Sequence, residues 1–175
     1  MSIMFGQMSN KVTTVLGIDC GTAITGWAIL EYKDIKTHPR IVDFGTIVTH
    51  KLSPEADRLV EIGDSIETLV NQFKPTELAI EDIFFFKNAK TVIKVSQARG
   101  VVIYKAVAMG LRHFSYTPPQ VKQAVTGYGR ADKKQIMQMV QQIFKLPSPK
   151  LQDDAADALA IAYSHWLYQG QAKLN

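Results

Sequence analysis

The chain has 175 residues, of which 46% are apolar and 21% charged, the size and composition of one globular domain. With 11 Gly, 7 Pro and the single cysteine Cys20, it is not a collagen-like repeat, a mostly disordered chain or a disulfide scaffold. The net charge of +4 is a weak indication of a polyanionic partner, because many proteins without such a partner carry a similar excess.

The sequence also bears on the compartment of the protein. No apolar run reaches the roughly 18 residues that a membrane span needs, and the longest candidate, 100–111, is interrupted by Lys105. Residues 1–10 contain no basic residue and no long apolar stretch, so they do not match a secretory signal. Cys20 has no intramolecular partner, which agrees with a reducing environment. We therefore expect a cytoplasmic protein without a membrane partner.

The first half of the chain predicts an antiparallel meander followed by a helix and a strand. Three apolar stretches of strand length come first, separated by Gly-containing or polar connections. They lie at 13–19, 25–32 and 41–49. Pro54 then opens a helix whose apolar residues follow a 3.6-residue period until Lys74 and Pro75 end it. A short strand is expected at 77–83.

The second half continues the alternation. A helix predicted over 91–110 carries apolar residues on more than one stripe, so we expect it to be buried on two sides. A strand at 112–116 precedes a short helix that begins at Pro118, and Asp132 is placed to cap an amphipathic helix. Asp153 is placed to cap a final Ala-rich helix.

The order of these elements predicts the fold class. An antiparallel meander followed by alternating strands and helices gives an α/β fold with a mixed sheet and helices on both faces. Residues 1–175 are expected to form a single domain, with 1–12 as a poorly ordered extension. No repeat or internal linker interrupts the pattern.

Four acidic residues occupy positions that are unusual for folding. Asp19 and Glu81 each end an otherwise apolar strand, where an acid is often only a surface or turn residue. Asp154 and Asp157 lie three positions apart on one face of the last helix, where they could simply complement the helix dipole. If the four converge, like charges would repel unless protonated or neutralised by hard cations such as Mg²⁺ or Mn²⁺. Only one of Glu81 and Asp82 can enter such a site, because adjacent strand residues face opposite ways.

The ordered motifs resemble those of the RuvC-type Holliday junction resolvases, a family with a fold of the ribonuclease H kind. The resemblance runs from Val15 to about Tyr163. Its motifs are GIDCG at 17–21, AIE at 79–81, KNA at 87–89, VSQARG at 95–100, YTP at 116–118, QVKQ at 120–123 and DAADALAIA at 154–162. The first motif is weakly specific, whereas the ordered set is strongly specific. The resemblance implies a ribonuclease H-like α/β fold with a mixed five-stranded sheet.

The resemblance further implies a catalytic cluster that binds two Mg²⁺ ions, with Mn²⁺ as a substitute. The implied catalytic and metal-binding residues are Asp19, Glu81, Asp154 and Asp157, which selects Glu81 over Asp82. Family members commonly carry Pro where this chain has Cys20, a departure that leaves the acids intact.

The activity that the resemblance implies is the resolution of four-way DNA junctions by paired symmetric nicks that leave 5′-phosphate and 3′-hydroxyl ends, in DNA recombination and repair. A twofold homodimer would present two equivalent sites to the junction. The helix at 91–110 would form the dimer seam, although an ordinary two-sided core position is an alternative. A branch-migration helicase is a further partner that the family suggests.

The charge distribution agrees with a DNA partner. Once the four acids are set aside, 20 Lys and Arg face the other 12 of the 16 acidic residues. The residues expected to contact DNA are Phe84, Lys87, Lys122, Arg130, Lys133 and Lys134. Phe84 matches a family aromatic that stacks on bases. Lys122 and Lys133 match family positions at the DNA, but either could serve only solubility.

Three other interpretations remain open at this point. The segment GIDCGT at 17–22 also resembles the first phosphate loop of actin-like ATPases and sugar kinases, which need a second such domain. The YqgF group of resolvase-like nucleases shares the opening motif but not the match over 87–100. A junction-binding structural protein that has lost catalysis would not need four intact acids.

Overall fold

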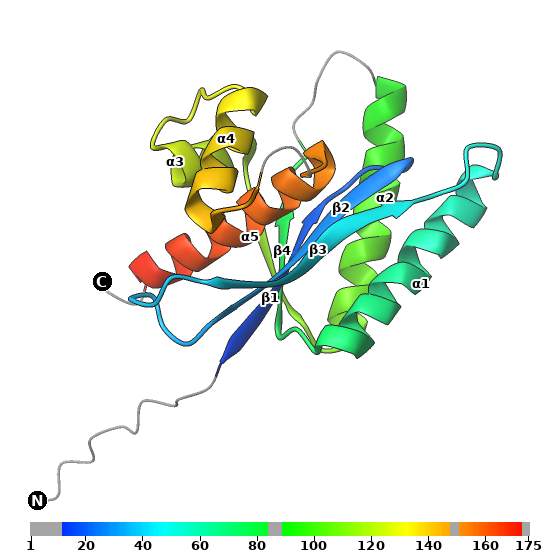
Figure 1. Cartoon of the computed structure of the whole chain (residues 1–175). Coiled ribbons are helices and arrows are strands. Elements are labelled where there is room, and N and C mark those ends of the chain that lie inside the picture. The colour runs from blue at the N-terminus through cyan, green and yellow to red at the C-terminus, as the bar shows by residue number, and fades with distance from the viewer. Residues whose placement is uncertain (1–11, 84–88, 148–150, 173–175) are drawn as a thin grey trace, which may run out of the picture.

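A mixed five-stranded sheet organises the chain, and a computed structural model describes it over residues 12–83, 89–147 and 151–172 (Figure 1). The strands are β1 (Thr13–Asp19), β2 (Ile24–Tyr32), β3 (Arg40–Val48), β4 (Glu77–Glu81) and β5 (Arg112–Tyr116). Their order in the sheet is β3-β2-β1-β4-β5, with β1, β2 and β3 antiparallel and β4 and β5 parallel to β1. The predicted mixed sheet is confirmed. Strand β4 is shorter than the predicted 77–83 because its pairing with β5 ends at Glu81 and Tyr116.

Helices cover both faces of this sheet, as predicted (Figure 1). They are α1 (Glu55–Phe73), α2 (Ala89–Ala108), α3 (Pro118–Thr126), α4 (Lys133–Phe144) and α5 (Asp153–Ala172). The alternation of side chains along β1 explains the two cores: Leu16 packs with α1 and α2, whereas Val15 packs with α3, α4 and α5. Neither helix layer alone could cover both apolar faces of the sheet.

Small residues bring α5 directly onto the centre of the sheet. A Cβ atom at Gly17 in β1 would lie 2.6 Å from the carbonyl oxygen of Ala158 and 2.7 Å from the Cβ atom of Ala162. Only glycine therefore permits this approach of helix and strand. The packing places the first turns of α5 beside the end of β1, where Asp19 lies.

The helix termini confirm one predicted cap and correct another. Asp132 caps α4 reciprocally with Gln135, through N–H donors 2.8 and 2.9 Å from the two side-chain oxygens. The prediction that Asp153 caps α5 was wrong, because α5 begins at Asp153 itself. The N–H of Ala156 donates to the carbonyl oxygen of Gln152 at 2.9 Å, so the chain is already helical beyond Gln152.

The helix α2, which the sequence predicts to be buried on two sides, is covered on one side by its own chain. Within the single chain, only the stripe of Ala98, Val102 and Ala106 is buried against the sheet and α1. Two apolar residues on the exposed side, Ile93 and Tyr104, are 59% and 73% exposed. Nothing in this chain covers them among the residues that the structure describes.

A buried polar network lies at the opposite end of β4 from Glu81. Glu77 is only 3% exposed at its side chain and accepts hydrogen bonds from Arg112 and, at 3.3 Å, from Tyr32. Its carboxylate also lies 2.5 Å from Nε2 of His165 in α5, whose Nδ1 is 2.7 Å from the Tyr116 hydroxyl. The network ties α5 to the sheet.

No helix of the described chain is long and apolar enough to span a membrane.

Candidate active site

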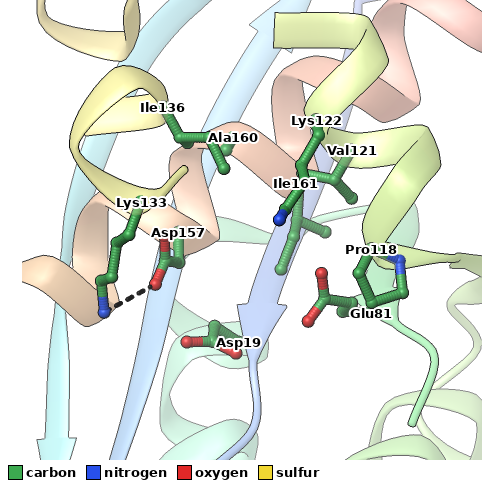
Figure 2. A pocket seen from close by; sticks show the side chains of 10 residues that line it. All are labelled: Asp19, Glu81, Pro118, Val121, Lys122, Lys133, Ile136, Asp157, Ala160 and Ile161. Carbon is green, nitrogen blue, oxygen red and sulfur yellow. Dashed lines mark ion pairs between the residues drawn. The ribbon is translucent and has the colours of Figure 1, made fainter. Parts of the chain in front are cut away.

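A hollow of about 290 Å³ opens where β1 and β4 end beside α5 (Figure 2). Three acidic side chains and two lysines line it together with apolar residues of α3, α4 and α5. The lining residues are Asp19, Glu81, Pro118, Val121, Lys122, Lys133, Ile136, Asp157, Ala160 and Ile161. Residues from five elements thus meet at one edge of the sheet.

The sheet topology places the two strand-end acids at this edge. Because β1 and β4 are parallel neighbours, with Ile18 opposite Ile80, their carboxyl ends lie side by side. Asp19 and Glu81 alternate in phase with Val15 and Ala79, which face α5. Both side chains therefore extend toward the α5 side of the sheet, and Figure 2 shows their carboxylates around the same space.

The first turns of α5 add the third carboxylate. Asp157 points into the hollow from the helix (Figure 2). Asp154, one turn earlier, does not line the hollow, but its charge contributes to raising the pKa of both Asp19 and Asp157. The sequence predicts that all four acids share one small volume; the hollow brings three of them together, and Asp154 lies outside its lining.

Burial and mutual repulsion perturb these acids. Burial raises the pKa of Asp19 from its ordinary 3.8 to about 7, and the charges of Asp157 and Asp154 add to the effect. Burial likewise raises the pKa of Glu81 from 4.5 to about 7, with further contributions from Asp19 and Asp157. The pKa of Asp157 is raised by burial, against the opposing charge of Lys133. A cluster of acids with such pKa values is typical of functional sites.

Two lysines balance part of this negative charge. Lys133, the first residue of α4, has its Nζ atom 3.2 Å from the carboxylate of Asp157 and 3.5 Å from that of Asp153. Lys122 of α3 lies on the other side of the hollow, and its charge lowers the pKa of Glu81. The hollow therefore combines carboxylates with positive charge at its rim.

The donor chemistry of the hollow fits a hard divalent cation, because carboxylate oxygens are preferred ligands and a cation would relieve their repulsion. As the side chains lie, however, no three Asp, Glu, His or Cys residues within 12–83, 89–147 and 151–172 gather closely enough to hold a metal ion. In this arrangement the Asp157 carboxylate forms an ion pair with Lys133.

The remaining predicted DNA contacts divide into two groups. Arg130 and Lys134 are exposed and lie within three residues of Lys133 in the chain, but they do not line the hollow. Phe84 and Lys87 fall outside the residues that the structure describes. Asp82, the alternative to Glu81, extends away from the hollow and pairs with Arg99.

Similarity to known proteins shows the family of the chain. Residues 15–165 match the family model described as crossover junction endodeoxyribonuclease RuvC. The chain belongs to the RuvC family. The match covers all three acids of the hollow, as well as Asp154.

Relatives and solved structures agree with the RuvC assignment. The chain is 48% identical to the crossover junction endodeoxyribonuclease RuvC of Fusobacterium nucleatum over 151 residues, 86% of this chain and 78% of that protein. It is 46% identical to the RuvC of Finegoldia magna, over 86% of this chain and 91% of that protein. The structure of T. thermophilus RuvC in complex with Holliday junction substrate superposes with a TM-score of 0.84 at 30% identity, covering 91% of this chain and 96% of that one.

The RuvC assignment confirms the predicted ribonuclease H-like fold and the predicted enzyme class, an endodeoxyribonuclease of DNA recombination and repair. It also favours the resolvase over the ATPase, YqgF-type and structural-protein interpretations, since the match extends over the whole sheet and the helices on both its faces. A more distant likeness to the yeast mitochondrial resolvase Ydc2, with a TM-score of 0.68 at 14% identity, concerns the fold alone.

Proposed function

We propose that this RuvC-family chain resolves four-way DNA junctions by paired, symmetric nicks and that the hollow at Asp19, Glu81 and Asp157 is the place of phosphodiester hydrolysis. The observation that carries the proposal is the convergence of these acids from β1, β4 and α5 on one hollow with lysines at its rim. The relative from T. thermophilus, solved with Holliday junction substrate, supports the choice of DNA.

The RuvC family consists of metal-dependent nucleases, and we propose Mg²⁺ as the ion, two per site, with Mn²⁺ as a substitute. The residues that would hold it are Asp19, Glu81, Asp154 and Asp157. When bound by these residues, the ions would supply activation of the attacking water and stabilisation of the leaving 3′ oxygen, giving 5′-phosphate and 3′-hydroxyl ends.

The residues of the chain itself prepare the site for this chemistry. With pKa values raised to about 7, Asp19 and Glu81 exchange protons near neutral pH, so that cations compete there with protons. Lys122 and Lys133 present positive charge toward an incoming phosphate. We assign Arg130, Lys134, Phe84 and Lys87 to the surrounding DNA contact, on the family resemblance and their position in the sequence.

The exposed apolar stripe of α2 supports a homodimer. Ile93, Tyr104 and Val107 are 59%, 73% and 47% exposed, and a second copy of the chain packed on them would remove this apolar surface from water. A C2 dimer would direct two equal sites at two strands of the junction. On the family resemblance we also propose a branch-migration helicase as a partner. From the length and the pattern of the sequence we propose residues 1–175 as one domain, and from the features of the sequence given above a cytoplasmic location.

The test is a nuclease assay on a synthetic four-way junction and on a linear duplex that contains the same arm sequences. The expected result is symmetric nicking of the junction in Mg²⁺, nicks that ligase reseals, and no product in a chelator. Equal cleavage of the duplex would contradict junction resolution, and cleavage in the presence of the chelator would contradict metal dependence.

A further inference from the structure

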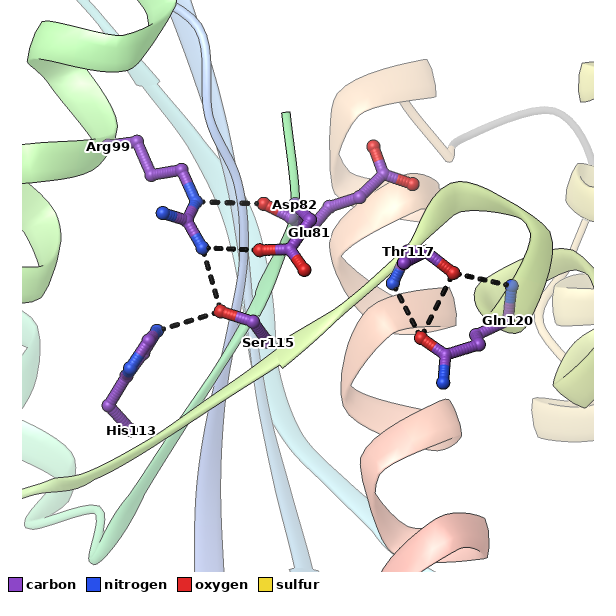
Figure 3. Close-up of polar contacts among 7 residues, drawn as sticks. All are labelled: Glu81, Asp82, Arg99, His113, Ser115, Thr117 and Gln120. Carbon is purple, nitrogen blue, oxygen red and sulfur yellow. Dashed lines mark hydrogen bonds and ion pairs between the residues drawn. The ribbon is translucent and has the colours of Figure 1, made fainter. Parts of the chain in front are cut away.

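A second polar cluster lies behind Glu81, on the face of the sheet away from the hollow (Figure 3). Its centre is Arg99 of α2. The Nε–H of Arg99 donates to the main-chain carbonyl oxygen of Glu81 at 3.0 Å. The other end of the guanidinium donates to the Asp82 carboxylate at 2.8 Å and to the Ser115 hydroxyl of β5 at 2.7 Å.

This cluster holds the point at which β4 ends. The N–H of Asp82 donates to the carbonyl oxygen of Tyr116 at 2.8 Å, so β5 holds the Glu81–Asp82 peptide unit from one side. Arg99 holds the carbonyl of the same peptide unit from α2. Because consecutive side chains alternate, the main chain that is fixed here directs Asp82 toward Arg99 and Glu81 toward the hollow.

The chemistry of the cluster suits a fixed position rather than a surface ion pair. A guanidinium group is planar and presents several N–H donors in a rigid fork, so it can bind three acceptors at once. The Arg99 side chain is 20% exposed, and hydrogen bonds to charged groups are stronger than neutral ones. Lys105, six residues later on α2, pairs instead with Glu67 of α1 and makes no hydrogen bond to β4 in the described part of the chain.

We propose that Arg99, together with Asp82 and Ser115, is a positioning residue that fixes the main chain of Glu81 and thereby the direction of its carboxylate in the nuclease site. The proposal rests on the proposed function, because it assigns Glu81 to that site. Arg99 belongs to α2, the helix with the exposed apolar stripe. Its hydrogen bond to the Glu81 carbonyl therefore links the surface assigned to the dimer with Glu81.

The decisive variant is Arg99→Ala, with Lys105→Ala as the control that breaks an ion pair of the same helix without reaching β4. We expect Arg99→Ala to lower the single-turnover cleavage rate at saturating junction roughly 10- to 100-fold, the loss usual for groups that orient metal ligands. The dissociation constant for the junction should stay within about twofold, because Arg99 lies on the face of the sheet away from the hollow. Lys105→Ala should keep the wild-type rate.

Two further readouts separate positioning from loss of structure. Free guanidinium ion at millimolar concentration should restore part of the rate of Arg99→Ala, because it can occupy the space between the same three acceptors, whereas methylammonium should not. Titration of the DNA-free protein with Mn²⁺ should give an affinity reduced by a similar factor, about 10- to 100-fold. Arg99→Lys, with a single ammonium group, should remain close to Arg99→Ala.

A wild-type rate for Arg99→Ala would overturn the proposal, and so would a loss of rate that follows a loss of folded protein and that guanidinium does not restore. If Arg99→Ala does not fold, Asp82→Ala keeps Arg99 and removes only its carboxylate partner; an unchanged rate in that variant would also overturn it. Glu81→Gln separates the failure of the proposed function from the failure of the positioning role. If Glu81→Gln cleaves the junction like the wild type, the assignment of Glu81 to the nuclease site fails. If Glu81→Gln is inactive but Arg99→Ala cleaves like the wild type, only the positioning role of Arg99 fails.

Discussion

The main chain at Gly26 in β2 passes so close to the carbonyl oxygen of Asp154 that a Cβ atom at position 26 would overlap it. The first turn of α5 thus rests directly on the strand that pairs with β1. This contact, with the similar one at Gly17, determines how near Asp157 comes to Asp19.

Gly26→Ala is therefore expected to displace the first turn of α5 and to lower the junction cleavage rate by more than about tenfold, with a loss of stability of about 1–3 kcal/mol from overpacking. Gly63→Ala in α1 is the control, since the nearest atom to a Cβ atom there would be a side-chain carbon of Val101 at 3.3 Å and not the main chain. Cleavage rates and thermal unfolding of both variants provide the measurement. A fully active Gly26→Ala would mean that the site tolerates movement of α5.

Asp157→Asn should abolish Mg²⁺-dependent cleavage and leave junction binding in place. The substitution keeps the shape of the side chain and removes a charge from the hollow, where lost electrostatic stabilisation typically costs roughly 100-fold or more in rate. Asp64→Asn is the control, because Asp64 is exposed on α1 and does not line the hollow. Gel-shift titration and single-turnover cleavage separate the two effects, and an equal loss of binding would identify Asp157 as a structural residue.

The raised pKa values of Asp19 and Glu81 predict a stability that falls with rising pH. Both groups titrate near 7 in the folded chain but near 4 when unfolded, so between these values the folded state binds more protons. In a chelator, the melting temperature should decrease from pH 5 to pH 8, each unit of pKa difference contributing about 1.4 kcal/mol. Asp19→Asn should flatten this dependence, as should added Mg²⁺. A dependence that is unchanged in Asp19→Asn would contradict the shift.

Lys133→Ala should weaken junction binding and reduce the slope of log affinity against log salt by about one unit, as expected for the loss of one phosphate contact. Lys36→Ala is the control, because Lys36 is exposed after β2, whose end pairs with the start of β1 and lies away from the hollow. Fluorescence anisotropy at several salt concentrations measures both slopes. If the slope does not change, Lys133 serves only its ion pair with Asp157.

Tyr104→Asp tests the dimer. A charge in the exposed apolar stripe of α2 should raise the dimer dissociation constant by about tenfold or more, since buried aromatic residues dominate such interfaces. Analytical ultracentrifugation measures the mass, and a nicked but unresolved junction should accumulate as the two cuts become independent. Tyr128→Asp, at an exposed tyrosine outside α2, is the control. A dimer that persists in Tyr104→Asp would move the interface elsewhere.

Local patterns in the sequence were sufficient for most of the fold. The apolar strand stretches, the period of α1 and the Asp132 cap depend on residues close together in the chain, and they are confirmed. Local pattern was misleading at the cap of α5, because the helix begins at Asp153 itself and not after it. Local pattern also does not show which face of α2 its own chain covers.

The candidate site could also be predicted only in part from the sequence. Strand parity indicated that Glu81 and Asp82 face opposite sides, but the choice between them came from the family resemblance, and α5 packed on the Val15 and Ala79 side of the sheet agrees with Glu81. The partners of Asp82 and of the buried Glu77 could not be predicted, because Arg99 lies 17 residues from Asp82 and His165 lies 88 residues from Glu77.

The amino-acid sequence by itself determined the elements, the family and the acids at the strand ends, since periodicity, caps and motifs are properties of neighbouring residues. Only the tertiary structure decided that Asp19, Glu81 and Asp157 line one hollow while Asp154 lies beside it, and that Arg99 holds Glu81 from behind. The physical reason is that these relationships depend on the parallel pairing of β1 with β4 and on the close approach of α5 to glycines, contacts between segments far apart in the chain.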